Sequence, residues 1–302
     1  NLLGNAEMEF TEEDFAEELF IGSTHDYIMF FTNRGRVYKI KGYEISETGR
    51  TSKGMNVVNL LPLESNEKVY TMIPVKEFNE SSYLIFVTRK GLVKKTSLDE
   101  YNTARKGGLN AIILDEDDEL VNVALTNGEA TIILGTRNGM MIRFSESDVR
   151  PTGRMSKGVK GIDLRKGDFV VGMSVAREGA AVLTVTENGF GKRTDTGEYK
   201  IQNRGGIGIT NYKINDKTGL VAGFKVVDEN DDIILIASDG VIIRTKASEI
   251  NVIGRATSGV RVMRLAEDVK LVSLARIVNE ETDESSSENV DETPSEDLTE
   301  TT

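Results

Sequence analysis

The decapeptide Phe30-Phe31-Thr32-Asn33-Arg34-Gly35-Arg36-Val37-Tyr38-Lys39 places two apolar runs on either side of a Thr-x-x-Gly turn. The pattern returns four more times in the 302-residue chain, with 56, 48, 50 and 51 residues between successive turn glycines. The later turn glycines are Gly91, Gly139, Gly189 and Gly240. Glycine adopts the positive φ of a tight hairpin at little cost, which explains its presence in every copy. The sequence therefore predicts five antiparallel hairpins within an internal repeat.

Two further features keep register with the turn glycine. A base stands four residues after it in every copy, at Lys39, Lys95, Arg143, Arg193 and Arg244. A second element, rich in glycine and arginine, follows fourteen to sixteen residues after the turn glycine. The bases of this second element are Arg50, Lys53, Arg105, Lys106, Arg154, Lys157, Arg204 and Arg255.

The repeat length indicates an all-β fold. Strand-like pieces such as Leu120–Leu125 and Val170–Val175 lie between the hairpins, so each unit of about 50 residues has room for about four strands. Four-stranded units at this period are typical of a β-propeller-like ring, here of five to six blades. The apolar run Val269–Leu274 could complete or close the ring, and helix is expected only near Glu12–Glu18.

Charge divides the chain into three parts. The formal net charge is −12, yet residues 1–18 hold seven acids and residues 279–302 hold ten, with no base in either end. Residues 19–278 therefore carry about +5, and net charge alone hides this basic body. We expect residues 1–18 to be an acidic linker or part of a first blade, 19–278 to be the ring, and 279–302 to be a disordered tail. Because the chain starts at Asn1 instead of Met, we expect it to be a piece of a longer polypeptide.

Composition excludes several kinds of chemistry. The absence of cysteine rules out thiolate nucleophiles and zinc ribbons, and His25 as the single histidine excludes multi-histidine metal sites. No catalytic or metal site is expected, and no P-loop ending is present. Tyr43, Tyr101 and Tyr199 recur at one repeat position, which indicates a packing role and not a nucleophile. Apolar runs are too short to cross a bilayer, so the chain is expected to be cytoplasmic.

The recurrent bases are the most informative candidates for function. A closed ring would carry them to equivalent places on successive blades and so make a curved basic rim. Such a rim meets successive phosphates of a nucleic acid and supplies affinity without reading base sequence. The alternative is that these bases cap loops and pair with nearby acids, as surface charges commonly do.

Several separate motifs, in the same order, resemble the C-terminal domain of the bacterial DNA gyrase A protein. The resemblance extends from about Glu12 to Val278. The motifs are Thr24-His25-Asp26-Tyr27, the opening decapeptide, Tyr43-Glu44-Ile45, Gly49-Arg50-Thr51, Val58-Asn59-Leu60-Leu61, Gly158-Val159-Lys160-Gly161, Gly189-Phe190-Gly191-Lys192-Arg193-Thr194 and Gly259-Val260-Arg261.

That resemblance implies a β-pinwheel, a propeller variant that wraps double-stranded DNA around its basic outer edge. It also implies a heterotetramer of the gyrase A and gyrase B proteins that introduces negative supercoils. The strand-cleaving tyrosine, ATP and Mg²⁺ would belong to other parts of that enzyme. This chain would then have no active site, no cofactor of its own and no membrane contact.

One motif departs from the family. The family's box reads Gln, a base, Arg, Gly, Gly, a base, Gly in the first blade. The nearest match here lies in a late repeat and keeps only five of the seven positions: Gln202, Arg204, Gly205, Gly206 and Gly208. We interpret it as a degenerate copy, and infer that the true box lies upstream of Asn1 or is absent.

Two alternatives share the predicted architecture. The equivalent domain of the topoisomerase IV A protein has fewer or more degenerate blades, so five clear units favour gyrase. A protein-interaction propeller would leave the recurrent bases scattered and would not bind DNA at low salt. The acidic tail suggests a regulatory hypothesis, because ten acids without a base could compete with DNA for the rim.

Overall fold

The computed structural model describes residues 27–44, 57–105 and 107–278. The repeating unit of the fold is an antiparallel hairpin. Five such hairpins are present, and each is closed by one of the turn glycines. The five turn glycines have φ between 74° and 88°, which confirms the reason for glycine there. The hairpins are β1 (Tyr27–Thr32) with β2 (Arg36–Lys41), β4 (Tyr83–Thr88) with β5 (Leu92–Ser97), β8 (Thr131–Thr136) with β9 (Met140–Ser145), β12 (Ala181–Thr186) with β13 (Phe190–Asp195), and β16 (Asp232–Ala237) with β17 (Ile242–Lys246).

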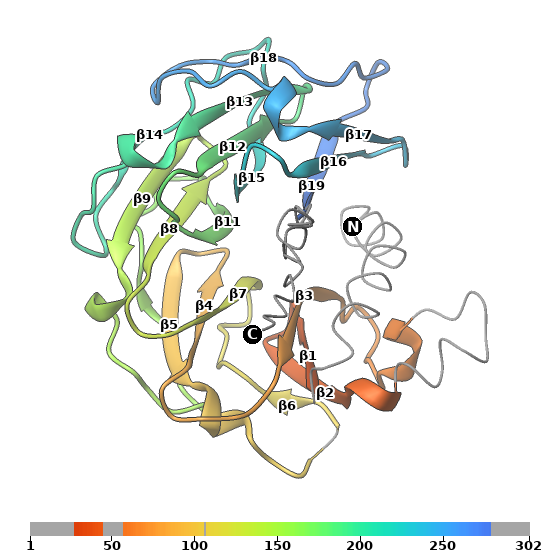
Figure 1. Ribbon diagram of the computed structural model, residues 1–302, viewed down its shortest axis with the longest axis vertical. Coiled ribbons are helices and arrows are strands. Elements are labelled where there is room, and N and C mark those ends of the chain that lie inside the picture. Colours follow the sequence, from red (N-terminus) through yellow and green to blue (C-terminus); the bar gives the residue numbers. More distant parts are fainter. Residues whose placement is uncertain (1–26, 45–56, 106, 279–302) are drawn as a thin grey trace, which may run out of the picture.

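A further strand pairs with the first strand of each hairpin and faces the middle of the ring (Figure 1). Neighbouring inner strands contact one another in chain order, so the sheets follow each other around an arc. These inner strands are β3 (Val69–Val75), β7 (Leu120–Thr126), β11 (Val170–Val175), β15 (Val221–Val227) and β19 (Leu271–Ile277). The result is the predicted all-β propeller with five blades.

The outermost strand of a blade comes from the next repeat. β6 (Leu109–Asn110) leaves the second repeat to pair with β2 of the first blade. The same exchange brings β10 (Val159–Lys160) to β5, β14 (Ile209–Thr210) to β9, and β18 (Val260–Arg261) to β13. The first four blades therefore have four strands, whereas the fifth has three in the described part of the chain, with β17 at its edge.

The turn glycine also receives this exchanged strand. The carbonyl of Gly189 accepts hydrogen bonds from the backbone N–H groups of Val262 and Met263, at 2.8 and 3.1 Å. A side chain at Gly189 would place its Cβ 2.2 Å from the Met263 carbonyl oxygen. Close approach of the next repeat is thus a second reason for glycine, which the hairpin pattern alone does not reveal.

The hydrophobic core lies between adjacent sheets. Phe31 of the first blade packs edge-on against Phe86 of the second, with ring centroids 5.7 Å apart, and both rings are fully buried. Both faces of most hairpin strands are covered in this way, so strands such as β12 and β16 are buried along their whole length. Each large apolar side chain buried in such an interface contributes about 1.5–3 kcal/mol.

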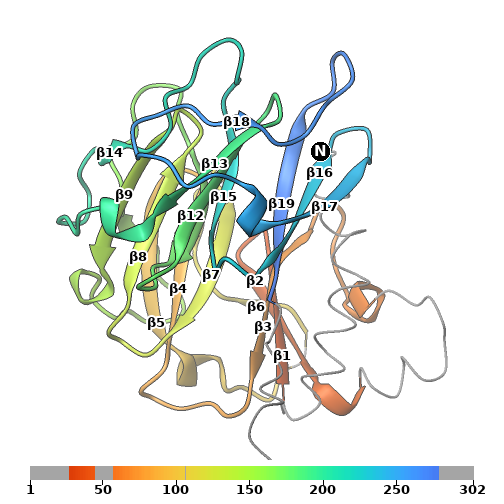
Figure 2. The same ribbon diagram turned by 45° about the horizontal axis from the view of Figure 1, so that its top comes forward.

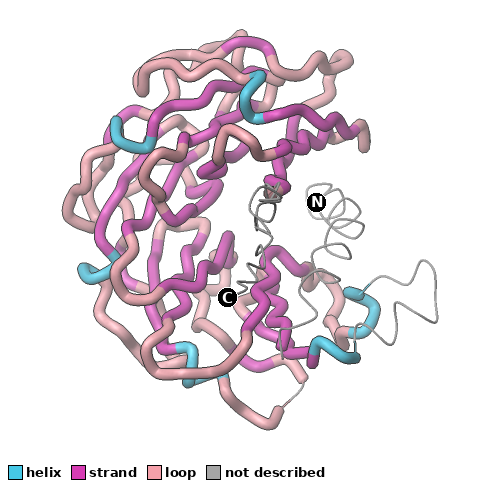
Figure 3. The backbone as a smooth tube through the Cα atoms, in the orientation of Figure 1, coloured by secondary structure: helices cyan, strands magenta, loops and turns pink. Residues whose placement is uncertain are grey.

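Helical structure within the described residues consists of short pieces, and they lie outside the one segment where the sequence predicted a helix (Figure 3). Residues 42–44, directly after β2, are α-helical, and the other pieces are 3-10 turns. One 3-10 turn precedes β3, and one follows the hairpin in each of blades two to five. They are η1 (Val57–Leu60), η2 (Leu98–Tyr101), η3 (Glu146–Asp148), η4 (Thr196–Glu198) and η5 (Ala247–Glu249). The helix expected near Glu12–Glu18, the acidic segment 1–18, His25 and the tail 279–302 lie outside the described residues.

Candidate nucleic-acid interface

Four segments that contain the exchanged strands form the perimeter of the ring, here called the outer band (Figure 1 and Figure 2). The outer band comprises residues 102–114, 150–166, 200–214 and 251–265. Its sequence holds fourteen lysines and arginines and a single acid, Asp163. The basic character of residues 19–278 is therefore concentrated on the outside of the arc.

Three arginines of the Gly-Arg elements join neighbouring blades along this band. The guanidinium of Arg154 donates to the carbonyl of Asn110, 2.7 Å away in the outer strand of the preceding blade. Arg204 and Arg255 donate in the same way to the carbonyls of Lys160 and Thr210. A guanidinium has five N–H donors, so each arginine keeps donors and its charge for an anion outside.

The other predicted bases of the Gly-Arg elements divide into two groups. Arg105 and Lys157 are exposed on the outer band, and Lys157 forms an ion pair with Asp115. Arg50, Lys53 and Lys106 lie outside the described residues.

The five hairpin bases do not form the curved basic rim that the sequence predicted. Lys95 is 5% exposed and lies 3.4 Å from the carboxylate of Glu146, which is itself fully buried. Arg193 is 8% exposed and donates to the carbonyl of Ile250 at 2.7 Å, and burial lowers the pKa of its guanidinium.

Lys39 and Arg143 follow the same pattern. Lys39 reaches the carbonyl of Thr103, and Arg143 reaches the carbonyls of Thr196 and Tyr199. Arg244, in the fifth blade, instead pairs with Asp232 on the neighbouring strand. Four of the five therefore tie a hairpin to the turn region of the next blade, which is the loop-capping alternative to the basic rim.

A buried carboxylate, Glu146, holds the turn that Lys95 reaches. Glu146 accepts hydrogen bonds from the Thr126 hydroxyl at 2.9 Å and from the Ala130 N–H at 2.8 Å. Together with Lys95 these donors satisfy the charge inside the protein, as a buried acid requires. The Lys95–Glu146 pair belongs to the architecture of the blade interface.

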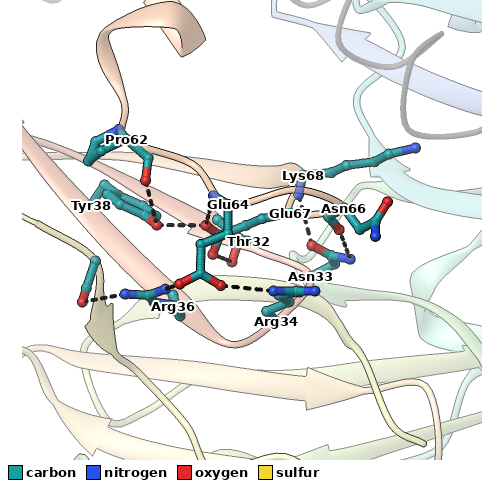
Figure 4. Close-up of polar contacts among 11 residues, drawn as sticks. Thr32, Asn33, Arg34, Arg36, Tyr38, Pro62, Glu64, Asn66, Glu67 and Lys68 are labelled. Atoms are coloured by element: carbon teal, nitrogen blue, oxygen red, sulfur yellow. Dashed lines mark hydrogen bonds and ion pairs between the residues drawn. The ribbon is translucent and has the colours of Figure 1, made fainter.

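The first blade contains a separate buried cluster centred on Tyr38 (Figure 4). Glu67, 6% exposed, accepts hydrogen bonds from the hydroxyls of Thr32 at 2.8 Å and Tyr38 at 2.6 Å. Burial and the neighbouring Glu67 raise the pKa of Tyr38 to about 12. Glu64 pairs with both Arg34 and Arg36, at 2.9 and 2.8 Å, so this part of the first blade carries balanced charge.

The degenerate box forms the crossing loop that leads into β14. Gly205 and Gly208 have φ of 88° and 76°, and a Cβ at Gly208 would lie 2.5 Å from the Met141 carbonyl oxygen. The Gln202 N–H donates to the Arg143 carbonyl, and the Gly206 carbonyl accepts from the Asp163 N–H. The two positions where the family has bases hold Asn203 and Ile207, and Ile207 is 52% exposed.

Sequence reasoning missed several bases of the outer band. Lys160 and Arg261 occupy the second position of two-residue outer strands, and both are exposed. Their shared distance of 21 residues from the turn glycine is the signal that could have found them. The remaining ones are Arg150, Arg165, Lys166, Lys200, Lys213 and Arg264.

The three recurrent tyrosines differ in burial. Tyr101 and Tyr199 are buried, with 0% and 1% exposure, and the hydroxyl of Tyr101 donates to the Ala111 carbonyl at 2.7 Å. Burial raises the pKa of both phenols. The packing prediction is wrong for Tyr43, which is 59% exposed beside the Lys41 ammonium.

Two searches over the described residues bear on other functions. They contain no group of three His, Cys, Asp or Glu residues placed to hold a metal ion. The same part of the chain has no helix long and apolar enough to cross a membrane.

Comparison with known proteins shows which family shares this geometry. The family described as "DNA gyrase C-terminal domain, beta-propeller" matches residues 26–76, 82–127, 130–177, 180–228 and 231–277, one blade-sized unit each. The DNA gyrase A protein of Staphylococcus aureus (strain MRSA252) is 47% identical over 298 residues, which is 97% of this chain and 33% of the relative. This chain thus spans about a third of the length of the curated relatives that it matches.

Two solved structures share the fold along most of both chains. The structure of a DNA gyrase A C-terminal domain is 29% identical with a TM-score of 0.72, covering 84% of this chain and 83% of the other. The C-terminal domain of a DNA topoisomerase IV is 28% identical with a TM-score of 0.75, covering 84% and 80%. The repeated hairpins, the exchanged outer strands and the matches to all five units agree: the chain belongs to the DNA gyrase C-terminal domain family of β-propellers, within the type IIA topoisomerases.

Proposed function

We propose that this chain binds double-stranded DNA along the outer band and bends it around the arc, without reading base sequence. The observation that supports this is the composition of the outer band, with fourteen bases and one acid on successive blades. Such a surface offers a phosphate backbone one cluster of cations after another. Side chains placed for phosphates position DNA without discriminating between bases.

The exposed and half-exposed bases of the band are the proposed contacts. Arg154, Arg204 and Arg255 already span adjacent blades, so their guanidinium groups are ordered before DNA arrives. This preorganisation lowers the entropy cost of each phosphate contact. The remaining proposed contacts are Arg105, Arg150, Lys157, Lys160, Arg165, Lys166, Lys200, Lys213, Arg261 and Arg264, with Arg50, Lys53 and Lys106 as sequence-based candidates. Lys39, Lys95, Arg143, Arg193 and Arg244 retain a DNA role only as predictions, because their cationic groups contact protein.

The energetics require several simultaneous contacts. Bending a 20–30 bp stretch by 40–90° costs about 1–6 kcal/mol, which no single surface contact offsets. Arginine-rich surfaces that wrap DNA elsewhere offset this cost by repeating a contact at each helical turn. A repeated band of bases around an arc provides that repetition.

In the longer relatives this domain is one part of a larger gyrase polypeptide. We infer that the wrapping serves negative supercoiling by a cytoplasmic assembly of the gyrase A and gyrase B proteins. The DNA-cleaving tyrosine, ATP and Mg²⁺ would act in the other parts of that assembly, and this chain would contribute DNA geometry and no catalysis. The relatives' names and the share of their length that this chain covers support this setting.

A salt series with outer-band variants tests the proposal. Affinity for mixed-sequence double-stranded DNA should fall by about 10³-fold or more between about 50 and 200 mM salt if six or more phosphates are contacted. Combining Arg150→Gln, Lys160→Gln and Arg261→Gln should weaken binding and lower the salt slope by about three. Lys76→Gln, just beyond inner strand β3, is the matched control and should leave both unchanged. Salt-independent binding, or equal losses in the control, would refute the proposal, and no binding at low salt would favour a protein-interaction propeller.

A further inference from the structure

Two lysines are buried beneath the outer band. Lys94 and Lys192 stand three residues after their turn glycines, in β5 and β13, and each is 1% exposed. The equivalent residue is Tyr38 in the first blade and Ile142 in the third. Because other blades fold with a phenol or an apolar side chain here, a hairpin does not need an ammonium at this position.

Each ammonium joins two consecutive segments of the outer band. Lys94 donates to the carbonyls of Ala111 and Arg154, both at 2.7 Å. Ala111 directly follows outer strand β6 of the first blade, and Arg154 precedes outer strand β10 of the second. Lys94 therefore fixes the end of one crossing segment against the start of the next.

Lys192 makes the same junction two blades later. It donates to the carbonyls of Asn211 at 2.6 Å, Gly254 at 3.0 Å and Arg255. Asn211 follows outer strand β14, and Gly254 and Arg255 precede outer strand β18. Three carbonyl acceptors use all three N–H groups of an ammonium, whereas a neutral amine has only two.

These contacts fix both the backbone carbonyl and the guanidinium of Arg154 and of Arg255, two of the arginines that join neighbouring blades. The carbonyl of Arg154 is bound by Lys94 while its guanidinium reaches Asn110, and Arg255 is held in the same way by Lys192 and Thr210. In the third blade Ile142 offers no such donor. There, Arg204 instead donates to two carbonyls, those of Asp148 and Lys160.

We propose that Lys94 and Lys192 are positioning residues for DNA binding, and that their buried charged ammonium groups hold the loops of Arg154 and Arg255 in the DNA-contacting arrangement. The inference rests on the function proposed above. It adds that DNA binding is coupled to protons on two groups that do not touch DNA. Lys192 needs its third N–H for three carbonyl acceptors, whereas the two acceptors of Lys94 leave its proton a matter of charge near the DNA phosphates.

Burial, modified by the neighbouring charges, lowers the pKa of both lysines toward neutral pH. Burial, with a smaller effect of the nearby Arg154, lowers the pKa of Lys94 to about 7, against an opposing effect of Glu100. Burial also lowers the pKa of Lys192 to about 8, with Glu198 raising and Arg255 lowering it. The remaining titratable groups around the two ammoniums are the phenols of Tyr101, Tyr199 and Tyr212.

Affinity and stability should respond to pH in opposite directions. Phosphates above the band favour the charged ammoniums, so DNA binding takes up protons and affinity falls as pH rises through about 7 and 8. The unfolded lysines have the ordinary pKa of about 10.4 and bind more protons than the folded ones, so the fold gains stability over the same pH rise. A lysine that merely supported the fold would not make affinity fall while stability rose.

The test measures affinity for mixed-sequence duplex DNA at fixed salt between about pH 6.5 and 8.5, where one required proton changes affinity by up to about tenfold per pH unit above its pKa. Wild-type affinity should fall at least about fivefold, and combining Lys94→Met with Lys192→Met should flatten the profile. Ile142→Met, at the same position of the third blade, is the matched control and should keep the wild-type profile. His25, the single histidine, is common to all variants.

A second readout does not depend on the variants folding. Calorimetry of wild-type binding in two buffers of different ionisation enthalpy should show net proton uptake near pH 7.5. A wild-type affinity that does not change with pH, zero proton uptake, or an unaltered profile in the double Met variant would overturn this inference alone. Failure of the wild type to bind DNA at any pH would overturn the proposed function and this inference together.

Discussion

Two of the turn glycines allow the backbone strain at positive φ to be separated from the steric clash with the exchanged strand. Gly189 and Gly240 occupy the same hairpin position with nearly equal φ, 87° and 85°. A Cβ at Gly189 would lie 2.2 Å from the Met263 carbonyl oxygen, whereas one at Gly240 would meet nothing within 4 Å. Gly240→Ala thus isolates the backbone strain, and Gly189→Ala adds the clash with the exchanged strand.

The magnitudes follow from those two contributions. A left-handed residue with a side chain costs about 1–2 kcal/mol, which is the loss expected for Gly240→Ala. Gly189→Ala also displaces the two hydrogen bonds from Val262 and Met263, worth about 0.5–1.5 kcal/mol each, so its total loss should be about 2–5 kcal/mol. Urea denaturation followed by circular dichroism measures both. Gly189→Ala should also weaken DNA binding, because Arg261 and Arg264 lie on the displaced segment. Equal losses of stability in the two variants would refute the idea that the exchanged strand sets the second requirement for glycine.

Three further predictions concern two buried side chains and the acidic tail. Glu146→Ala should destabilise the fold by about 3–5 kcal/mol by leaving the Lys95 ammonium buried without its partner; a loss below about 1 kcal/mol in urea denaturation would show that the pair is not structural. Tyr38→Phe should cost about 1–3 kcal/mol, because Glu67 loses a buried donor, and ultraviolet titration should find the wild-type Tyr38 phenol ionising near its pKa of about 12; an ordinary tyrosine pKa there would contradict the cluster geometry. Deleting residues 279–302 should raise DNA affinity if the ten acids compete for the outer band, and an unchanged dissociation constant at low salt would leave the tail without that role.

The sequence repeat predicted the positions of the hairpins well, but it predicted the burial and contacts of the recurrent basic side chains less well. The spacing of the turn glycines was enough to define five blades, because a hairpin turn imposes a local requirement that one residue type meets. Exchange of the outer strand could not be inferred, because that strand is two residues long and its partner lies in the preceding repeat.

The hairpin bases were misplaced for a related reason. Lys94 and Lys95 point to opposite faces of one strand, and a strand with one solvent face would expose one of them. Both faces of a central blade are covered by neighbouring sheets, so both lysines are buried. Alternation along a strand therefore predicts which residues share a face, but it does not predict whether that face is exposed to solvent or covered by a neighbouring sheet. The bases proposed to contact DNA belong to the crossing segments, where position relative to the outer strand is the informative coordinate.

Exchange of the outer strands has a mechanical consequence for the proposed bending of DNA. Under the proposed function, tension from the DNA would act on strands such as β10, whose backbone is hydrogen-bonded to β5 of one repeat while its covalent chain continues into β11 of the next. A pull on one blade is thus divided between hydrogen bonds on one side and the polypeptide itself on the other. Recoil of a bent duplex would then be resisted by two repeats in each of the first four blades, whereas the three-stranded fifth blade, in the described part of the chain, would lack this sharing.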